Sequence, residues 1–326
     1  MNSFGRIFRI SVFGESHGNS IGIVMDGIPA GIPLSEADFE PDLSRRRAGA
    51  KGTTPRKEPD MPKLISGIYN GNTTGAPLTV LFENTNTSLT DYDHLHDTPR
   101  PGHTDFTSRV KFSGYSDLRG GGHFSGRLTL ALVTAGVLAK KVIPVNIHAE
   151  ILEIGGEKDI QKALETIQGT GDSIGGIIQC TASGIPAGLG EPFFDSMESV
   201  ISHLVFSIPG IKGIEFGSGF ESAQMRGSQH NDPIIDSSGK TLTNHAGGIN
   251  GGITNGNDLV FRVAVKPTSS ISLPQQTLNF HTGSIEPMQL EGRHDTCIAL
   301  RMPVIIEAAA SIALADFLLL SKTRSK

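Results

Sequence analysis

Two long segments of the chain are apolar at nearly every position. The first runs from about Gly126 to Val142, and the second begins at Pro303 and runs to about Leu320. Proline is compatible with the first turn of a helix, and a helix that is apolar on almost all faces belongs in a core. The second segment contains Glu307 and Asp316 and is too short to span a membrane easily. We therefore expect two buried helices.

Shorter strand and turn patterns precede the two apolar segments in the same order. The pentapeptide Gly-Ile-Pro-Ala-Gly occurs at 27–31 and again at 184–188, each time between an expected strand and a helix-start pattern. A glycine-rich turn then leads into an alternating strand, at 77–83 in the first case and at 259–265 in the second. Unless the pentapeptides are a coincidence of turn chemistry, the chain consists of two similar halves.

This order predicts a single domain with an internal pseudo-repeat of about 1–145 and 146–326. Each half would form a sheet packed on helices, because an element with one apolar face must bury it against another element. The two apolar helices would then lie at the centre, between the sheets.

Composition narrows the class of protein. The 326 residues are 37% hydrophobic, which is enough apolar material for a folded core and argues against disorder. A formal net charge of −5 gives no excess of cations for phosphate neutralisation, so a nucleic-acid-binding protein is not expected. The two cysteines, and a first segment that carries Arg6 and Arg9 instead of a signal-sequence pattern, favour a reducing, cytoplasmic location.

The polar chemistry is concentrated in three irregular stretches, at 45–60, 84–119 and 226–257, which hold 8 of the 15 arginines and 5 of the 11 histidines. Long stretches without a helix or strand pattern tend to be functional in compact proteins. The 11 histidines include no recognisable metal-binding spacing, so no metal site is expected.

The first motif, at 14–18, is Gly-Glu-Ser-His-Gly. Its Gly-x-Ser-x-Gly spacing matches the nucleophile elbow of serine hydrolases, in which a helix follows the serine. A strand-like segment at 21–25 follows here, which favours a hairpin. A histidine between glycines has little apolar packing available, so we favour a functional imidazole at His17. A serine hydrolase and a non-enzymatic oligomeric scaffold remain the alternative functions.

Two more segments combine cations or histidine with rigid turns. Arg45–Arg47 is either a solvated helix end or an anion-binding cluster, since guanidinium groups bind phosphate and carboxylate in a bidentate manner. In Pro99–Asp105, prolines and Gly102 would hold His103 in a fixed position suited to acid–base chemistry. Asp105 would either orient this imidazole or cap a turn.

Polar loops also precede or follow regular elements at three places. Arg119–Arg127 runs into the first apolar helix, where free backbone N–H groups favour an anion. Lys266–Ser270 ends a strand with a cation and three hydroxyl groups, and Gly292–Asp295 precedes the second apolar helix. Asp295 could be a partly desolvated base there.

Taken in order, these motifs resemble the chorismate synthase family over nearly the whole chain. The segments that carry the resemblance are Gly14–Gly18, Arg45–Arg47, Arg100–His103, Arg119–Gly122 with Ser125 and Arg127, Gly227–Gln229, Asn244–Gly248, Lys266–Ser270 and Gly292–Asp295. The resemblance implies an α+β fold, a β-α-β sandwich with pseudo-twofold symmetry, assembled as a homotetramer. It also implies a lyase that binds reduced FMN and eliminates phosphate from 5-enolpyruvylshikimate-3-phosphate (EPSP) to give chorismate.

The resemblance also implies roles for individual residues. His17 would protonate the departing phosphate, His103 would lie near the flavin ring, and Asp295 would relay the ring proton. The substrate-binding residues would be Ser16, Arg46, Lys51 and Arg127. The FMN-binding residues would be His123, Phe124, Ser125, Pro209, Gly210, Gly251, Lys266, Pro267, Thr268, Ser269, Ser270 and Arg293.

This chain departs from the family pattern at two of these places. Many relatives have Arg-Ser where this chain has His123 and Phe124, and many have an arginine near the position of Lys51. No separate reductase domain is visible, so we expect the enzyme to depend on an external flavin reductase that uses NADPH.

Overall fold

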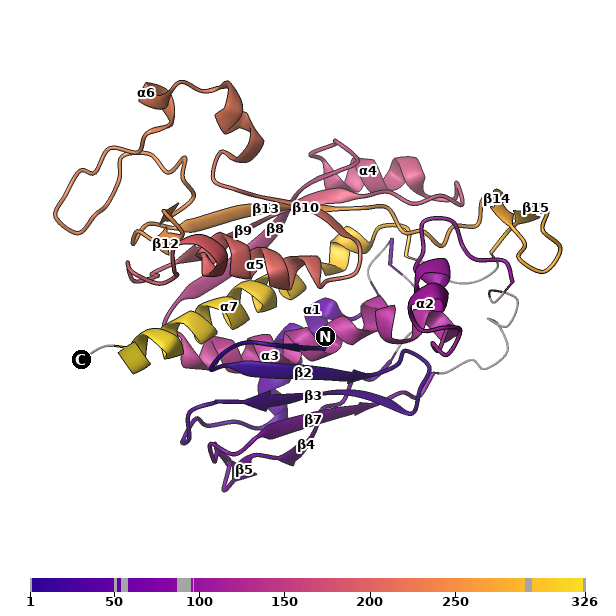
Figure 1. The fold of residues 1–326 in the computed structure, drawn as a ribbon, viewed down its shortest axis with the longest axis horizontal. Coiled ribbons are helices and arrows are strands. Elements are labelled where there is room, and N and C mark those ends of the chain that lie inside the picture. The colour runs from indigo at the N-terminus through magenta and orange to yellow at the C-terminus, as the bar shows by residue number, and fades with distance from the viewer. Residues whose placement is uncertain are drawn as a thin grey trace.

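Two antiparallel sheets enclose a layer of helices in the computed structural model of the chain (Figure 1). The structure describes residues 2–49, 52–53, 58–86, 95, 97–290 and 295–324. The strands of the first sheet are, in spatial order, β1 (Ser3–Phe4), β2 (Arg9–Gly14), β3 (Ser20–Asp26), β7 (Leu78–Glu83) and β4 (Lys63–Ser66). Those of the second sheet are β10 (Ile211–Phe216), β13 (Leu259–Val265), β9 (Gly176–Ser183) and β8 (Asn146–Ile154). The α+β prediction is therefore confirmed.

The two apolar segments form the central helices α3 (Thr129–Val142) and α7 (Pro303–Arg324), which lie side by side between the sheets (Figure 1). A Cβ atom added to Gly136 of α3 would lie 2.4 Å from the Cβ of Ala308 of α7, so the helices are in close contact there. By length and composition α7 could cross a membrane, but 83% of its apolar window is buried inside the protein. Both predicted core helices are confirmed.

The remaining helices and hairpins connect and cover these layers. The α-helices are α1 (Glu40–Arg46), α2 (Asp105–Lys111), α4 (Ile160–Ile167), α5 (Met197–Phe206) and α6 (Gly227–His230). The 3-10 turns are η1 (Glu36–Phe39), η3 (Arg119–Phe124), η4 (Gly126–Leu128), η5 (Phe193–Asp195), η6 (Gly219–Gln224) and η7 (Ile298–Arg301). Short hairpins are formed by β5 (Ile68–Tyr69) with β6 (Asn72–Thr73), β11 (Ile249–Asn250) with β12 (Ile253–Thr254), and β14 (Gln275–Leu278) with β15 (Ile285–Met288).

The two sheets share one strand order, since β2-β3-β7-β4 in the first corresponds to β8-β9-β13-β10 in the second. The two pentapeptide turns are also held in the same way. Thr73 Oγ1 donates to the carbonyl of Pro29 at 2.7 Å, and Thr254 Oγ1 donates to the carbonyl of Pro186 at 2.8 Å. In both turns the same threonine hydroxyl also accepts a backbone N–H at 2.9 Å. Equivalent sequence motifs thus make equivalent contacts.

Candidate active site

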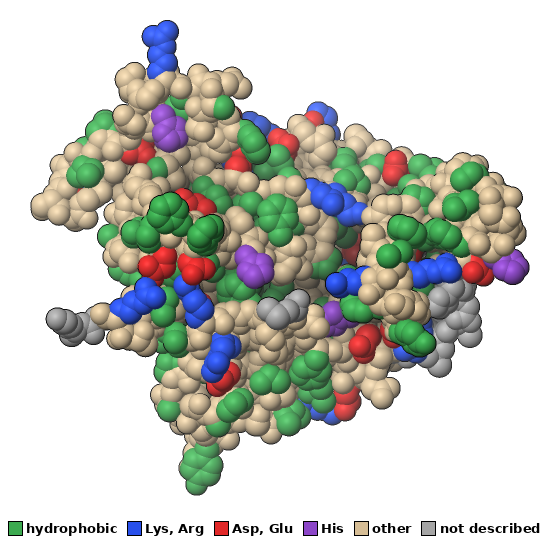
Figure 2. Space-filling view, in the orientation of Figure 1, with side chains coloured by type: hydrophobic (Ala, Val, Ile, Leu, Met, Phe, Trp, Pro, Cys, Tyr) green, Lys and Arg blue, Asp and Glu red, His purple; other side chains and the backbone are tan. Residues whose placement is uncertain are grey.

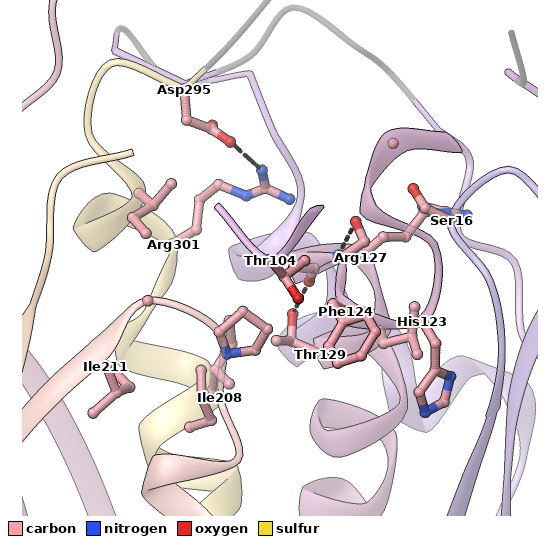
Figure 3. Close-up of a pocket in the computed structure, with 18 of the residues that line it drawn as sticks. Ser16, Thr104, His123, Phe124, Arg127, Thr129, Ile208, Ile211, Asp295 and Arg301 are labelled. Atoms are coloured by element: carbon pink, nitrogen blue, oxygen red, sulfur yellow. Dashed lines mark hydrogen bonds and ion pairs between the residues drawn. The ribbon is translucent and has the colours of Figure 1, made fainter. Parts of the chain in front are cut away.

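One cavity of about 1570 Å³ lies where loops of both halves meet beside the central helices. Fifteen residues predicted to be functional line it: Ser16, His17, Arg46, His103, His123, Phe124, Ser125, Arg127, Pro209, Gly210, Lys266, Thr268, Ser269, Ser270 and Asp295. In Figure 3, Asp295 lies on one wall, while Ser16, His123, Phe124 and Arg127 lie on the opposite wall. Residues from six separated motifs therefore share a single cavity.

The Gly-Glu-Ser-His-Gly motif forms the tight connection between β2 and β3, as the hairpin prediction requires. A strand follows Ser16 instead of a helix, so the serine does not lie on a nucleophile elbow. Ser16 and His17 are both buried, at 1% and 6% exposure. The Ser16 N–H donates to the Gly122 carbonyl at 3.0 Å, and Asn84 Nδ2 donates to the carbonyl oxygens of Glu15 and Gly18. The loop that carries His17 is thus anchored at both ends.

The glycine turn η3 passes between the two histidines predicted to be catalytic. Gly120 and Gly121 have φ values of +58° and +83°, which are left-handed conformations that favour glycine. A Cβ atom on Gly120 would lie 2.5 Å from His17 Nε2, and one on Gly121 would lie 3.6 Å from His103 Nε2. The absence of side chains here lets the backbone approach both rings.

His103 is held by a buried ion pair on its own loop. Its Nδ1 lies 2.7 Å from Asp105 Oδ1, and Arg100 donates to both carboxylate oxygens of Asp105 from Nε at 2.7 Å and Nη2 at 2.8 Å. Burial lowers the pKa of His103, and the charges of Arg100 and Lys266 lower it further, although the bond to Asp105 acts in the opposite direction. The neutral imidazole is therefore the favoured form near pH 7.

A wall of buried guanidinium groups faces the cavity. Arg46 is 2% exposed and donates to Thr129 Oγ1, to Asp60 and to two backbone carbonyls, so most of its N–H groups already bond the protein. Burial and the charges of Arg301 and Arg127 lower the pKa of Arg46 to about 9. Burial is the largest cause of this shift, and the nearby positive charges add to it, while Asp60 and Asp295 only partly offset them.

Arg127 contributes an available donor to this wall. Its Nε donates to Asn84 Oδ1 at 2.7 Å and its Nη1 to Asp60 Oδ1 at 2.9 Å. Its Nη2 is buried and has no hydrogen-bond partner among the described residues; it forms only an ion pair with Glu58 Oε2, at 4.0 Å. A buried N–H group without a partner is costly, and an anion in the cavity would satisfy it.

Asp295 and Arg301 lie on the opposite wall, and Lys266 and Lys212 add further cations to the cavity lining. Asp295 pairs with Arg301, whose Nη1 lies 3.2 Å from Asp295 Oδ2 (Figure 3). Lys266 Nζ donates to the Gly102 carbonyl at 2.9 Å and also bonds Ser269. Burial and the neighbouring charge of Lys212 lower the pKa of Lys266, so these two ammonium groups repel each other across the cavity wall.

An apolar surface lies between the two polar walls. Phe124 is 37% exposed and, like Pro209 and Ile208, lines the cavity. His123 turns its Nδ1 to the Gly14 carbonyl at 2.8 Å, so this histidine is fixed to the β2–β3 loop. Thr268 Oγ1 is buried and has no hydrogen-bond partner among the residues that the structure describes. A flat, partly apolar ligand with polar ends would match these surroundings.

Some predicted site residues are not among those that line the cavity. Pro267 lies next to the wall without lining it, and Gly251 lies in the β11–β12 hairpin. Lys51 and Arg293 lie outside the described residues. Their assigned roles stay predictions.

Sequence reasoning missed several polar residues in or next to the cavity, among them Asn84, Asp60, Lys212 and Arg301. A signal existed for one of them. Arg301 stands two residues before α7, as Arg127 stands two residues before α3, so the internal similarity pairs the two arginines. No comparable signal marked the other three: Asn84 follows β7, Asp60 lies in an irregular segment, and Lys212 lies within β10.

The structure shows no group of three or more histidine, cysteine or acidic side chains able to hold a metal ion within its described residues. Both cysteines, Cys180 and Cys297, are buried and form no disulfide.

Comparisons with known proteins agree with the motifs. The model of the family described as chorismate synthase matches residues 8–319. A chorismate synthase of Chitinophaga pinensis is 61% identical, with 100% of this chain and 99% of the relative covered. One of Dehalococcoides mccartyi is 41% identical over 98% of this chain and 96% of its own length. A crystal structure of chorismate synthase superimposes with a TM-score of 0.75 and 25% sequence identity, covering 98% of this chain and 93% of that one.

Proposed function

Because the chain belongs to the chorismate synthase family, whose members convert EPSP into chorismate, we propose that the cavity described above is where this chain carries out that reaction. The activity is that of a carbon–oxygen lyase acting on a phosphate ester, EC 4.2.3.5, in aromatic amino acid biosynthesis. The observation that carries the proposal is the meeting of His17, His103 and Asp295 in one cavity beside a basic wall.

The basic walls match the charge of the substrate. EPSP carries one phosphate and two carboxylates, and each needs charge-assisted hydrogen bonds when it leaves water. We assign Arg127 to one of these anionic groups because its Nη2 is buried without a partner among the described residues. Arg46 would act mainly by its charge, since its donors are engaged by the protein, and Ser16 would donate from its hydroxyl group.

The elimination breaks a C–O bond and a C–H bond at opposite ends of an allylic system. The phosphate leaves with the electron pair of the C–O bond, and the ring proton departs to a base. We assign proton donation to the leaving phosphate to His17, whose imidazole lies beside Ser16 and the glycine turn. Asp295 on the opposite wall would accept or relay the ring proton, and Arg301 would hold its carboxylate in place.

The family depends on a reduced flavin, and the described residues fit one. Lys266, Lys212 and the hydroxyl of Thr268 would hold the phosphate and ribityl end, which fits the unpartnered Thr268 Oγ1. Phe124 and Pro209 would contact the ring system, and His103 would face its polar edge. We propose that the flavin is FMN; when bound, reduced FMN supplies electron density to the substrate as the C–O bond breaks.

The surroundings of the enzyme are also proposals. We infer that an external, NADPH-dependent reductase supplies the reduced flavin and that the protein acts in the cytoplasm. The face in Figure 2 shows basic side chains interspersed with acidic ones, which supports a small anionic substrate over a nucleic acid. Phe193, Phe194 and Phe220 are more than four-fifths exposed, which supports burial of this surface in a homotetramer.

An anaerobic assay tests the proposed function. EPSP and dithionite-reduced FMN are mixed with the protein, and chorismate is followed by its absorbance. Formation of chorismate and phosphate in equal amounts is expected, and absence of chorismate would refute the proposal. In a parallel aerobic assay with NADPH and oxidised FMN, turnover comparable to that under dithionite would refute dependence on an external reductase.

A further inference from the structure

The strongest unassigned feature of the cavity is the polar chain behind His103. It runs from Ser270 through Arg100 and Asp105 to the imidazole. Arg100 Nη1 donates to Ser270 Oγ at 3.2 Å, and Arg100 forms a bidentate pair with Asp105. Asp105 is 1% exposed and also accepts from the Arg100 backbone N–H at 3.1 Å. The four groups form one continuous chain of hydrogen bonds.

The charge state of Asp105 fixes the direction of its bond to His103. Burial alone would raise the pKa of Asp105, but hydrogen bonds from Arg100 and His103 hold it well below its usual range. An ionised carboxylate can only accept hydrogen bonds. The 2.7 Å contact therefore requires a hydrogen on His103 Nδ1.

The opposite ring nitrogen follows from this assignment. A neutral imidazole carries one hydrogen, so Nε2 has a free lone pair when Nδ1 is protonated. The Nε2 edge faces Gly121, in the turn that separates His103 from His17. The charged groups that act on the ring are Asp105, the first residue of α2, Arg100 on the preceding loop, and Lys266, which directly follows β13.

We propose that Asp105 is a positioning residue for the reaction: clamped by Arg100, it accepts the Nδ1–H of His103 and thereby presents Nε2 of that imidazole to the cavity. The proposal decides between the two roles that the sequence left open for Asp105, orienting an imidazole and capping a turn. Asp105 begins α2, but its side chain bonds Arg100 and His103. The positioning role of Asp105 rests on the proposed function only in its expected effect on turnover.

The substitution Asp105→Asn tests the tautomer directly. Oδ2 accepts two bonds from Arg100, whereas Oδ1 accepts one from Arg100 and one from His103. An asparagine would keep its oxygen on the side with two arginine donors and turn its NH₂ group towards the imidazole. His103 Nδ1 would then have to accept, and the hydrogen would move to Nε2.

Solid-state ¹⁵N NMR of protein labelled only at histidine nitrogens measures this change, with His103→Gln identifying the signals of His103 among the 11 histidines. In the unsubstituted protein we expect protonated Nδ1 and unprotonated Nε2, and in Asp105→Asn the reverse. Protonated Nε2 in the unsubstituted protein would overturn the proposal. The measurement on the unsubstituted protein needs no variant of Asp105 and no substrate. Its result therefore depends neither on whether the variant folds nor on whether the proposed function is correct.

A double-mutant cycle then tests whether Asp105 acts through His103. Asp105→Asn alone is expected to lower kcat by about 10-fold or more, within the range for groups that control proton transfer. In a His103→Ala background the same substitution should cost less than about twofold, because the two residues act as one unit. Equal losses in both backgrounds would overturn the proposal.

A matched control uses a carboxylate–arginine pair outside the cavity. Asp26 Oδ2 accepts from Arg9 Nη2 at 2.7 Å, and neither residue lines the cavity. Asp26→Asn should leave both kcat and the His103 signals unchanged. A change in the His103 signals of this variant would show that they respond to any loss of a carboxylate–arginine pair in the fold. That result would overturn the assignment to Asp105.

Discussion

In this protein, the neighbours of a side chain decide its role more than its residue type does. His17 and His103 are both imidazoles in the same cavity, yet one lies on the β2–β3 loop and the other in a buried ion-pair chain. Arg46 and Arg127 are both buried guanidinium groups, but only Arg127 has a buried nitrogen without a hydrogen-bond partner among the described residues. These neighbours determine which group can bind or transfer a proton.

His17→Ala tests the assigned proton donor. Without the imidazole, the phosphate must leave with no protein acid beside it, so turnover should fall by about 10²-fold or more. Chorismate formation under anaerobic conditions is the measurement. The control is substrate affinity, measured by equilibrium binding, which should change much less. Unchanged turnover would remove His17 from the mechanism.

Gly120→Ala tests the close approach of the glycine turn to His17. The new Cβ atom would lie 2.4 Å from His17 Cδ2 and would also strain a backbone with φ of +58°. We expect turnover to fall by at least about 10-fold because the imidazole is displaced. Gly114→Ala is the matched control, since its φ is +83° and nothing lies within 4 Å of its added Cβ. Equal losses of turnover in the two variants would contradict the displacement of His17.

The sequence predicted which residue types meet in the cavity, but it did not predict how they bond. Motifs such as Arg100–His103 identify chemistry because few structural needs bring proline, glycine and histidine together. One hydrogen-bond partner of Arg127 is Asn84, 43 positions away, and no local pattern encodes such a contact. Likewise, only the folded structure shows that Asp105 bonds His103 as well as Arg100.

At the scale of elements, the long apolar segments were the most predictable part of the fold. A helix that is buried on all faces appears in the sequence as a continuous hydrophobic run, and α3 and α7 could be predicted from such runs. The start of α3 was less predictable: Ser125 caps the separate turn η4, and the α-helix begins at Thr129 instead of Gly126. The left-handed glycines of η3 are visible as a glycine run, but their contacts depend on loops brought from elsewhere.

Gly136→Ala tests the packing of the two central helices. Alanine favours a helix over glycine, so in an open position it would stabilise the fold. Here the new methyl group would overlap Ala308, and we expect the free energy of unfolding to fall by about 1–3 kcal/mol. Urea denaturation measures this change. Adding Ala308→Gly should recover part of the loss, and a double variant no more stable than Gly136→Ala would argue against this contact.

At the scale of the whole molecule, Glu307 joins elements from both halves. Its carboxylate accepts from Arg45 of α1 at 2.7 Å, from Lys140 of α3 at 3.3 Å and from the Ala149 N–H of β8 at 3.0 Å. Burial alone would raise the pKa of Glu307, but the bonds from Arg45 and the charge of Lys140 lower it overall. The ionised form therefore favours the folded state.

Glu307→Gln should lower the free energy of unfolding at pH 7 by about 2 kcal/mol, because Arg45 and Lys140 lose their ionised partner while remaining partly hydrated. A carboxyl with a depressed pKa stabilises the fold above its unfolded value of about 4.5 and loses that contribution as the pH falls through its folded value. Urea midpoints of the two proteins should therefore converge as the pH drops below about 4.5. A difference that stays constant from pH 7 to about pH 3 would contradict the assignment.

The repeated order of motifs predicted two halves and a central helical layer, because each half carries its own strands and one apolar helix. The position of the cavity at one end of that layer was not predictable, since both halves have polar glycine loops at several places. Gly251, which the resemblance assigns to FMN, lies in the β11–β12 hairpin and is not among the residues that line the cavity, so its role stays a prediction.

A cut in the chain between α3 and β8, within the short connection 143–145, would place the apolar helices α3 and α7 on different fragments. Either fragment made alone would expose a helix whose natural covering is on the other fragment, and should aggregate. Made together in one cell, the two fragments should associate and restore catalysis by complementation, with no covalent link between them.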